Sequence, residues 1–242
     1  MRGLLATVRA VVAYPSIIVI TLILGFVAII GARLPRRWRV SDRAARVWAW
    51  LFLKLAGLHY HVEGRENIDP AVPQVIVSNH LSNLDPMTHW LALWPLHYRY
   101  MAKKELYKIP LFSSAIKAMH MVKVDRQAGV GGYEFINRQV REVFALGYSL
   151  MVYGEGTRSR TGEIRDFKKG PFILAKAIDA PILPVTIHGP EHAWPPGDWR
   201  MYGGKATVVV HPLLEFSGTV EDMQVRTHQI IAETYARLEA PA

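Results

Sequence analysis

The spacing of hydrophobic positions changes about a quarter of the way along this chain. Residues 10–32 carry no charged side chain, and a run of that length can cross the hydrocarbon core of a bilayer. In residues 41–57 apolar side chains recur at helical spacing among basic ones, with Trp48 and Trp50 expected at a membrane interface. The pattern therefore predicts a membrane-associated anchor of two helices over residues 1–57.

Beyond this region, short β-branched runs alternate with helical patterns, and polar turns separate them. Such alternation is typical of an α/β domain. We expect residues 58–242 to form one domain, a mixed central sheet flanked by helices on both faces. The expected strands are 58–67 with its turn, 74–77, 98–102, 120–124, 149–153, 182–188 and 206–210. The expected helices are 87–94, 111–119, 131–146, 171–178 and a C-terminal helix capped by Thr219 that ends near Leu238.

Positive charge is concentrated in the first region. The formal net charge is +9, and nine of the 29 Lys and Arg residues, but only one of the 20 Asp and Glu residues, lie in residues 1–58. A basic segment beside an apolar run favours anionic lipid over nucleic acid. The basic residues among 33–39 favour a retained anchor over a cleaved signal peptide, and they would lie on the cytoplasmic side if the helix spans. A hairpin dipping into one leaflet is the alternative topology. Cysteine is absent, which excludes a thiolate nucleophile.

The segment from Ser78 to Asp85 carries the clearest candidate chemistry. It follows the β-branched run 74–77 and precedes Pro86. Proline is favoured at the first position of a helix and aspartate at the N-cap, so we expect Asp85 to cap a helix and His80 to lie on the turn before it. An imidazole oriented by a carboxylate is a general base near neutral pH. His80 and Asp85 are therefore the candidate catalytic pair.

A second polar segment, Glu155-Gly156-Thr157-Arg158-Ser159, follows the strand expected at 149–153. Glycine allows the backbone to approach a ligand closely, and a guanidinium offers a planar set of donors suited to phosphate. Residues 167–171 lead into another helix start, which is a second candidate anion site. The chain has neither G-x-G-x-x-G nor G-x4-G-K-[ST], which argues against a nucleotide phosphate loop.

Taken together, these segments resemble the lysophospholipid acyltransferase superfamily, and most closely its bacterial 1-acyl-sn-glycerol-3-phosphate acyltransferases. The resemblance extends over about residues 58–215. Many members have Phe-Pro where this chain has Tyr153-Gly154, and the glycine is expected to loosen that turn and reshape the acceptor pocket. In chain order the matching blocks are Asn79–Asp85 with its H-x4-D spacing, Lys123–Arg126, Glu155–Ser159 followed by Phe167–Gly170, and Ile182–Val185.

The resemblance implies transfer of a fatty acyl group from a thioester donor, acyl-CoA or acyl carrier protein, to the free sn-2 hydroxyl of lysophosphatidic acid. The product would be phosphatidic acid, an intermediate of phospholipid biosynthesis. It further implies no metal, no cofactor beyond the thioester co-substrate, and a location at the cytoplasmic face of the bacterial inner membrane. The implied site residues are His80 as base, Asp85 as its partner, Arg158, Lys103 and Arg126 at the acceptor phosphate, and Glu155, Gly156, Thr157, Ser159 and Pro184 at the substrate.

Other interpretations stay open at this point. The acceptor could be a different lysolipid, such as a lyso-aminolipid. A metal-dependent hydrolase could use His80, Asp85 and Glu155 as ligands, although no histidine lies four residues from His80 and no H-E-x-x-H occurs. A basic lipid-binding or scaffold protein would explain the N-terminal charge but not the four ordered blocks. Glu155 and Arg158 could also simply pair with each other on a turn.

Overall fold

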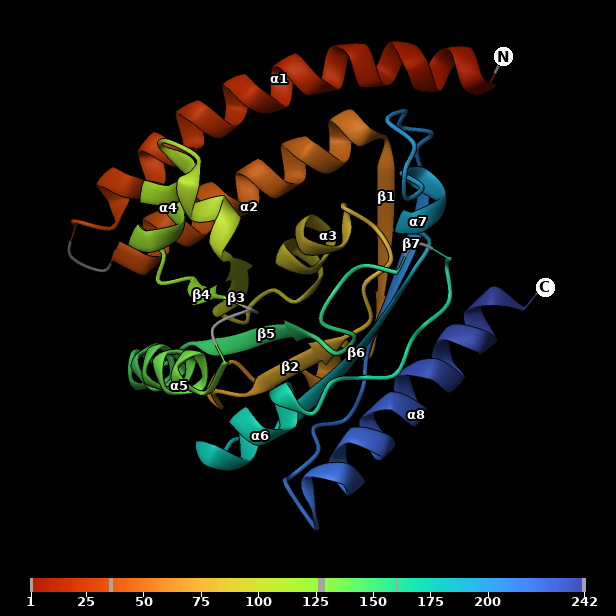
Figure 1. Cartoon of the computed structure of the whole chain (residues 1–242). Coiled ribbons are helices and arrows are strands. Elements are labelled where there is room, and N and C mark those ends of the chain that lie inside the picture. The colour runs from red at the N-terminus through yellow and green to blue at the C-terminus, as the bar shows by residue number, and fades with distance from the viewer. Residues whose placement is uncertain (1, 35–36, 126–128, 160, 241–242) are drawn as a thin grey trace.

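The computed structural model describes residues 2–34, 37–125, 129–159 and 161–240. Within them the strands form one seven-stranded sheet in the order β1-β7-β6-β2-β5-β3-β4 (Figure 1). The strands are β1 Leu58–Glu63, β2 Val75–Ser78, β3 Tyr98–Lys103, β4 Val122–Val124, β5 Ser149–Tyr153, β6 Ile182–His188 and β7 Gly204–Val210. Every strand expected from the sequence is present.

Helices connect the strands, and two of them precede the sheet. The α-helices are α1 Arg2–Gly31, α2 Arg37–Ala56, α3 Asp85–Ala92, α4 Phe112–Ala118, α5 Gly129–Ala145, α6 Gly170–Ala177, α7 Pro190–Ala193 and α8 Val220–Glu239, and short 3₁₀ helices cover Arg65–Asn67 and Lys104–Lys108. Thr219 caps α8 as expected, in a reciprocal capping box with Asp222. The one-turn α7 and the two 3₁₀ helices are too short to give a periodic signal, and the sequence did not predict them.

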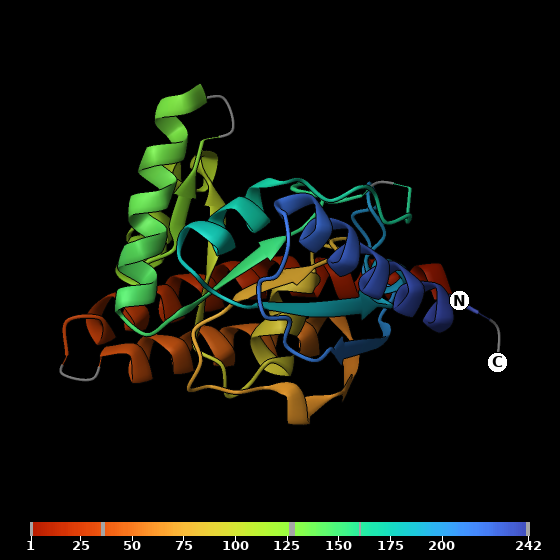
Figure 2. The same cartoon turned by 90° about the horizontal axis from the view of Figure 1, so that it is seen from below.

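The sheet is mixed, as the sequence predicts. The five strands β6, β2, β5, β3 and β4 run parallel to one another. β7 pairs with β6 in the antiparallel direction, and β1 runs parallel to β7. Parallel strands require helical crossovers, which cover both faces of a sheet. Here α2 and α3 pack on one face, and α5, α6 and α8 pack on the other (Figures 1 and 2).

Side-chain alternation along the strands builds a core on each face. In β2, Val75 and Val77 contribute to the core beneath α5, α6 and α8, whereas Ile76 contributes to the core beneath α2 and α3. All three side chains are fully buried. Successive residues of a strand point to opposite faces, so a strand covered on both sides must be apolar throughout. That requirement explains the uninterrupted β-branched run in the sequence.

The two N-terminal helices pack side by side as an antiparallel pair above one face of the sheet (Figure 1). Trp48 Nε1 donates to Thr21 Oγ1 at 2.8 Å, and Ser41 Oγ donates to the Ala28 carbonyl at 3.0 Å. α1 also binds the body of the protein, because Arg9 donates to the Met201 carbonyl at 3.1 Å. The helical pair is thus part of the tertiary structure and not a detached tail.

Two side chains of α2 make tertiary contacts. Trp48 donates to Thr21 of α1, and Arg46 packs over the Trp94 ring at 3.6 Å and donates to the Leu96 carbonyl. Burial lowers the Arg46 pKa to about 10. Trp50 is 50% exposed and keeps the position expected for an interfacial side chain. Periodicity identified the helix, but it could not reveal that tertiary contacts use part of its basic face.

α1 presents a long apolar surface to the outside. By length and composition it can cross a membrane, and it is the only helix in the described part of the chain that can. Its side chains that point away from the protein include Ile18, Leu22 and Phe26, which are 62%, 50% and 57% exposed. An exposed apolar patch of this extent indicates contact with lipid or with another protein.

We expect the double substitution Leu22→Glu/Phe26→Glu to lower the partition constant for lipid vesicles by about a hundredfold or more. Each large apolar side chain transferred from water stabilises the bound state by about 1.5–3 kcal/mol, and a charge in its place opposes transfer. Vesicle flotation of the purified chain measures the bound fraction. Val225→Glu on α8, which replaces a side chain that is 64% exposed, is the matched control and should bind normally. Equal flotation of both variants would contradict a role for the α1 surface.

Candidate active site

The two polar segments, residues 78–85 and 155–159, follow the ends of neighbouring strands. Ser78, the last residue of β2, pairs with Tyr153, the last residue of β5, and the two strands are parallel. The carboxyl ends of parallel strands meet at one edge of a sheet, where ligands of open α/β folds bind. The loop that carries His80 and the loop that carries Arg158 therefore begin side by side.

His80 is held at both ends of its backbone by the second loop. Its N–H donates to Glu155 Oε1 at 3.2 Å, and its carbonyl accepts from the Ser159 N–H at 2.9 Å. The preceding Asn79 is fixed just as firmly, because its side chain donates to the Ile187 carbonyl at 2.7 Å and accepts from the Ile187 N–H at 2.9 Å. The turn thus has ties to both β5 and β6.

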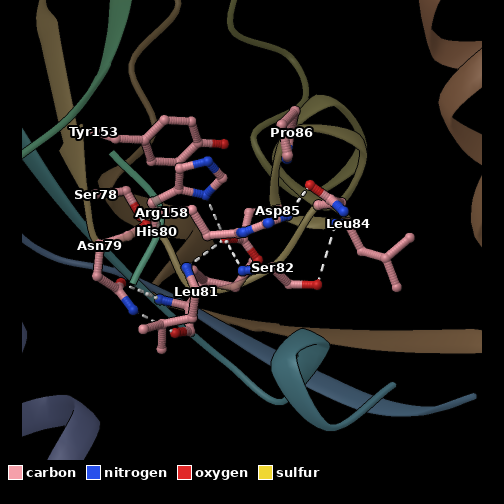
Figure 3. A network of polar contacts seen from close by, with 12 residues as sticks. Ser78, Asn79, His80, Leu81, Ser82, Leu84, Asp85, Pro86, Tyr153 and Arg158 are labelled. Atoms are coloured by element: carbon pink, nitrogen blue, oxygen red, sulfur yellow. Dashed lines mark hydrogen bonds and ion pairs between the residues drawn. The ribbon is translucent and has the colours of Figure 1, made fainter. Parts of the chain in front are cut away.

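Asp85 organises the turn around its own carboxylate (Figure 3). Its Oδ2 accepts from the N–H groups of Leu81 and Ser82, each at 2.8 Å, and lies 2.7 Å from His80 Nδ1. Asp85 is fully buried, whereas the His80 side chain is 18% exposed. Because a carboxylate only accepts hydrogen bonds, it fixes the proton of a neutral His80 on Nδ1 and leaves the Nε2 lone pair available.

The expected role of Asp85 as a helix cap is wrong by one position. α3 begins at Asp85 itself, and Leu84 is the N-cap. The carboxylate does not bind the first N–H groups of the helix, because it is turned back toward the loop and receives the N–H groups that precede it. The local pattern located the helix start correctly but could not show the direction of the side chain.

A buried aromatic network supports the imidazole from behind, and the sequence did not predict it. The Tyr153 ring stacks on the His80 ring with centroids 3.9 Å apart and planes 13° apart (Figure 3). The Tyr153 hydroxyl lies 3.4 Å from His89 Nδ1, and His89 Nε2 lies 3.2 Å from Ser78 Oγ. Burial lowers the His89 pKa to about 4, so this second histidine is neutral at pH 7. The one sequence feature that could have indicated this contact is the position of Tyr153 at the end of a strand, directly before the second polar segment.

His80 lies on the wall of a cavity of about 1550 Å³. One part of this cavity extends between the N-terminal helices and α4, where its walls are apolar. The residues that line this part include Leu24 and Gly25 of α1, Trp48 of α2, Phe112 and Ile116 of α4, and Met119, which follows α4. The cavity therefore joins a polar edge of the sheet to an apolar chamber under α1.

Basic side chains gather where the cavity meets the sheet edge. Arg158, Lys103 and Lys168 all line it. Arg158 also donates to Asn83 Oδ1 on the loop between His80 and Asp85, while its Nε is buried without a partner. Arg126 lies outside the described residues. A guanidinium with spare donors beside two ammonium groups is suited to an anionic ligand.

The other predicted substrate residues divide into two groups. Glu155, Gly156 and Thr157 line the cavity, as expected for residues that meet a ligand. Ser159 and Pro184 do not line it: Ser159 is buried and ties its backbone to His80, and Pro184 lies inside β6, paired with Val77 of β2. Their positions in the chain marked the motif correctly, but they support the site and do not face it.

Gly154 has a different consequence from the one expected. A Cβ at this position would lie 2.5 Å from Cγ of Phe167, whose ring packs directly on the glycine. Phe167 is 3% exposed, and the Lys168 N–H donates to the Gly154 carbonyl at 2.7 Å. The glycine therefore does not loosen the turn. It makes room for a ring that holds the two ends of the loop together.

Two of the open interpretations are not supported by this geometry. Glu155 does not pair with Arg158, because its Oε1 binds the His80 N–H and its Oε2 lies 3.8 Å from Arg165 Nε. His80, Asp85 and Glu155 also do not converge as metal ligands anywhere in the described structure. One oxygen of each carboxylate, Asp85 Oδ2 and Glu155 Oε1, accepts from a backbone N–H group, whereas Asp85 Oδ1 and Glu155 Oε2 have no hydrogen-bond partner.

Proteins of similar sequence support the interpretation of this region as an acyltransferase site. Residues 59–188 match the model of the family described as Acyltransferase. The chain is 29% identical over 203 residues to a 1-acyl-sn-glycerol-3-phosphate acyltransferase of Pseudomonas aeruginosa, covering 82% of this chain and 77% of that protein. It is 26% identical over 236 residues to a protein of the same name from Limnanthes douglasii, covering 97% and 83%.

A solved structure shares the whole architecture. The 1-acyl-sn-glycerophosphate acyltransferase of Thermotoga maritima superposes with a TM-score of 0.86 at 24% identity, covering 100% of this chain and 99% of that chain. With a family model that spans more than half of its length, the chain belongs to the acyltransferase family. The scaffold interpretation is therefore wrong, because the four ordered blocks are those of an enzyme family.

Burial of Glu155 gives a prediction about pH. The site raises the Glu155 pKa from 4.5 to about 7, chiefly because the carboxyl is buried. The folded state holds this proton more tightly than the unfolded state, so its contribution to stability is present below pH 4.5 and lost as the pH rises to about 7. We expect the free energy of unfolding of the native chain to lose about 3 kcal/mol relative to Glu155→Gln across this window.

Urea unfolding of both proteins between pH 4.5 and 8 measures this difference. The glutamine keeps an oxygen for the His80 N–H but cannot titrate. Glu233→Gln, at an exposed position on α8, is the control and should follow the native profile. Parallel profiles for the native chain and Glu155→Gln would contradict the assignment.

Proposed function

We propose that this enzyme transfers a fatty acyl group from acyl-CoA or acyl carrier protein to the sn-2 hydroxyl of lysophosphatidic acid, forming phosphatidic acid. The observation that carries the proposal is the 2.7 Å contact between His80 Nδ1 and a fully buried carboxylate, on the wall of a cavity that is basic at one end and apolar at the other. Relatives named for this activity, which resemble the chain over most of its length, support it.

In the proposed step, His80 Nε2 removes the proton from the acceptor hydroxyl as its oxygen attacks the thioester carbonyl. Asp85 Oδ2 stabilises the imidazolium that forms, as it already lies within hydrogen-bond distance of Nδ1. Collapse of the tetrahedral intermediate breaks the carbon–sulfur bond, and the imidazolium returns the proton to the leaving thiolate. The products are the ester and the free thiol, and the step requires no metal or further cofactor.

The acceptor phosphate is proposed to bind Arg158, with Lys103 and Arg126 in support. Arg158 lines the cavity and binds Asn83, which lies on the loop of the catalytic pair, so a phosphate held there is close to the base. Gly156 and Thr157 lie on the same wall and suit the glycerol portion. Glu155 lines the cavity as well, and it also holds the backbone N–H of His80 through Oε1.

Residues 1–57 are proposed to anchor the enzyme in the membrane, and residues 58–242 to form the catalytic domain, at the cytoplasmic face. The exposed apolar side of α1 supports contact with lipid. Its opposite side lines the apolar part of the cavity, which suits an acyl chain that enters from the bilayer. A soluble thioester donor and a lipid acceptor meet most readily at such an interface.

His80→Ala is expected to lower acyl transfer by a factor on the order of 10²–10⁴, because the general base is lost. The assay measures phosphatidic acid formed by purified enzyme, with melting temperature as the check on folding. His59→Ala, at an exposed histidine of β1, is the matched control and should retain activity. A folded His80→Ala protein with normal turnover would refute the mechanism.

Arg158→Ala is expected to raise the KM for lysophosphatidic acid by about ten- to a hundredfold, since a hydrogen bond to a charged group contributes about 1.5–3 kcal/mol. The KM for the acyl donor should change little. Arg226→Ala on the exposed side of α8 is the control. A change confined to the KM for the acyl donor would refute the role of Arg158.

A panel of lysolipids tests the identity of the acceptor. Faster turnover of a lyso-aminolipid than of lysophosphatidic acid would overturn lysophosphatidic acid as the substrate.

A further inference from the structure

A second cluster of titratable side chains lies outside the catalytic cavity, at the carboxyl end of β6. His188 ends that strand, Glu191 and His192 lie on α7, and Glu239 ends α8. One nitrogen or oxygen atom from each of the four lies within 4.8 Å of all the others. None of them lines the cavity that contains His80. Figure 1 shows the C-terminal end of α8 on the side of the molecule where α7 lies.

The distances within this cluster suit a single small cation. His188 Nε2 lies 2.8 Å from Glu239 Oε2 and 3.9 Å from Glu191 Oε1, and His192 Nε2 lies 3.7 Å from the same Glu191 oxygen. Tetrahedral coordination at metal–ligand distances of about 2.0–2.1 Å places ligand atoms roughly 3.3 Å apart. The observed separations bracket this value, and no two of the four atoms lie more than 4.8 Å apart.

The buried carboxylate of the cluster has an oxygen without a partner. Glu191 is only 6% exposed, and its Oε2 has no hydrogen-bond partner. Its Oε1 accepts from the Gly189 N–H at 2.9 Å and from the Tyr235 hydroxyl at 3.1 Å, which fixes the side chain in place. A buried carboxylate oxygen with no partner is costly, and a cation offsets that cost. Burial also raises the Glu191 pKa.

The chemistry of the donor set indicates which cations fit. Two imidazole nitrogens and two carboxylate oxygens favour zinc and neighbouring divalent transition metals over magnesium or calcium, which prefer oxygen alone. Residues 188–192 also read H-x-x-E-H, a spacing at which both histidines bind zinc in an unrelated class of metallopeptidases. Here the glutamate is held by the Gly189 N–H and Tyr235, so it is placed as a ligand and not as a free base.

We propose that His188, Glu191, His192 and Glu239 form a binding site for one divalent transition-metal ion of the zinc class. The ion joins the C-terminal end of α8 to the corner between β6 and α7. It acts on stability and not on the chemical step, since the site is separate from the catalytic cavity. His188 follows Ile187, whose backbone is clamped by Asn79, so a fixed β6 end also steadies the catalytic turn.

The test uses the full-length chain in detergent, stripped with a chelator and titrated with Zn²⁺ by calorimetry. We expect one ion per chain and a rise of several degrees in Tm on saturation. The double variant His192→Ala/Glu239→Gln replaces the two most exposed ligands, which spares the fold, and should weaken Zn²⁺ binding at least tenfold and abolish the rise in Tm. The matched control, His61→Ala/Glu233→Gln, changes an exposed histidine and glutamate elsewhere.

Binding in the control and in His80→Ala should equal that of the native chain, which separates this site from the catalytic histidine. Co²⁺ gives a second readout, because four-coordinate cobalt absorbs visible light, and the absorption should be missing from the double variant. Absence of saturable one-to-one binding would overturn the proposal. Equal binding by the double variant and the control would overturn it as well. Neither result bears on acyl transfer, which the His80 variant tests separately.

Discussion

One carboxylate oxygen organises the catalytic end of this molecule. Asp85 Oδ2 receives two backbone N–H groups and lies against His80 Nδ1, in a place with no solvent access. Such a buried carboxylate is tolerated because its donors replace the lost water. The same donors define the shape of the turn, so the orientation of the imidazole and the path of the backbone have a single origin. The H-x4-D spacing is the length of chain that lets the loop close on itself in this way.

The second motif completes this arrangement from the neighbouring strand. Glu155 accepts a hydrogen bond from the His80 N–H, and the Ser159 N–H donates to the His80 carbonyl. Tyr153 stacks on the His80 ring. These residues lie far from His80 in sequence, and the parallel pairing of β2 with β5 brings them together. The loop from Glu155 to Ser159 and the loop that carries His80 are therefore one unit.

The sequence predicted the strands, the longer helices and the pairing of His80 with Asp85, because these depend on local periodicity and short spacing. It could not predict contacts that only the tertiary fold creates. Arg46 and Trp48 of α2 turn inward for this reason, and Ser159 and Pro184 support the site without facing it. The prediction that Gly154 loosens its turn was wrong for the same reason. In the fold this glycine makes room for the Phe167 ring. The sequence did not predict the cluster around the H-x-x-E-H run, because Glu239 joins it only through the path of α8.

The tie between Ser159 and the His80 carbonyl has a consequence for the order of events in a turnover. The five-residue stretch from Glu155 to Ser159 carries the Arg158 guanidinium, which lines the cavity. Each end of the stretch makes a hydrogen bond to the His80 backbone. Because Asp85 and this stretch already hold His80 in place, the proton acceptor is oriented before any lipid arrives. With the headgroup bound by Arg158, as proposed, the lipid then needs only to bring its hydroxyl to a base that is ready.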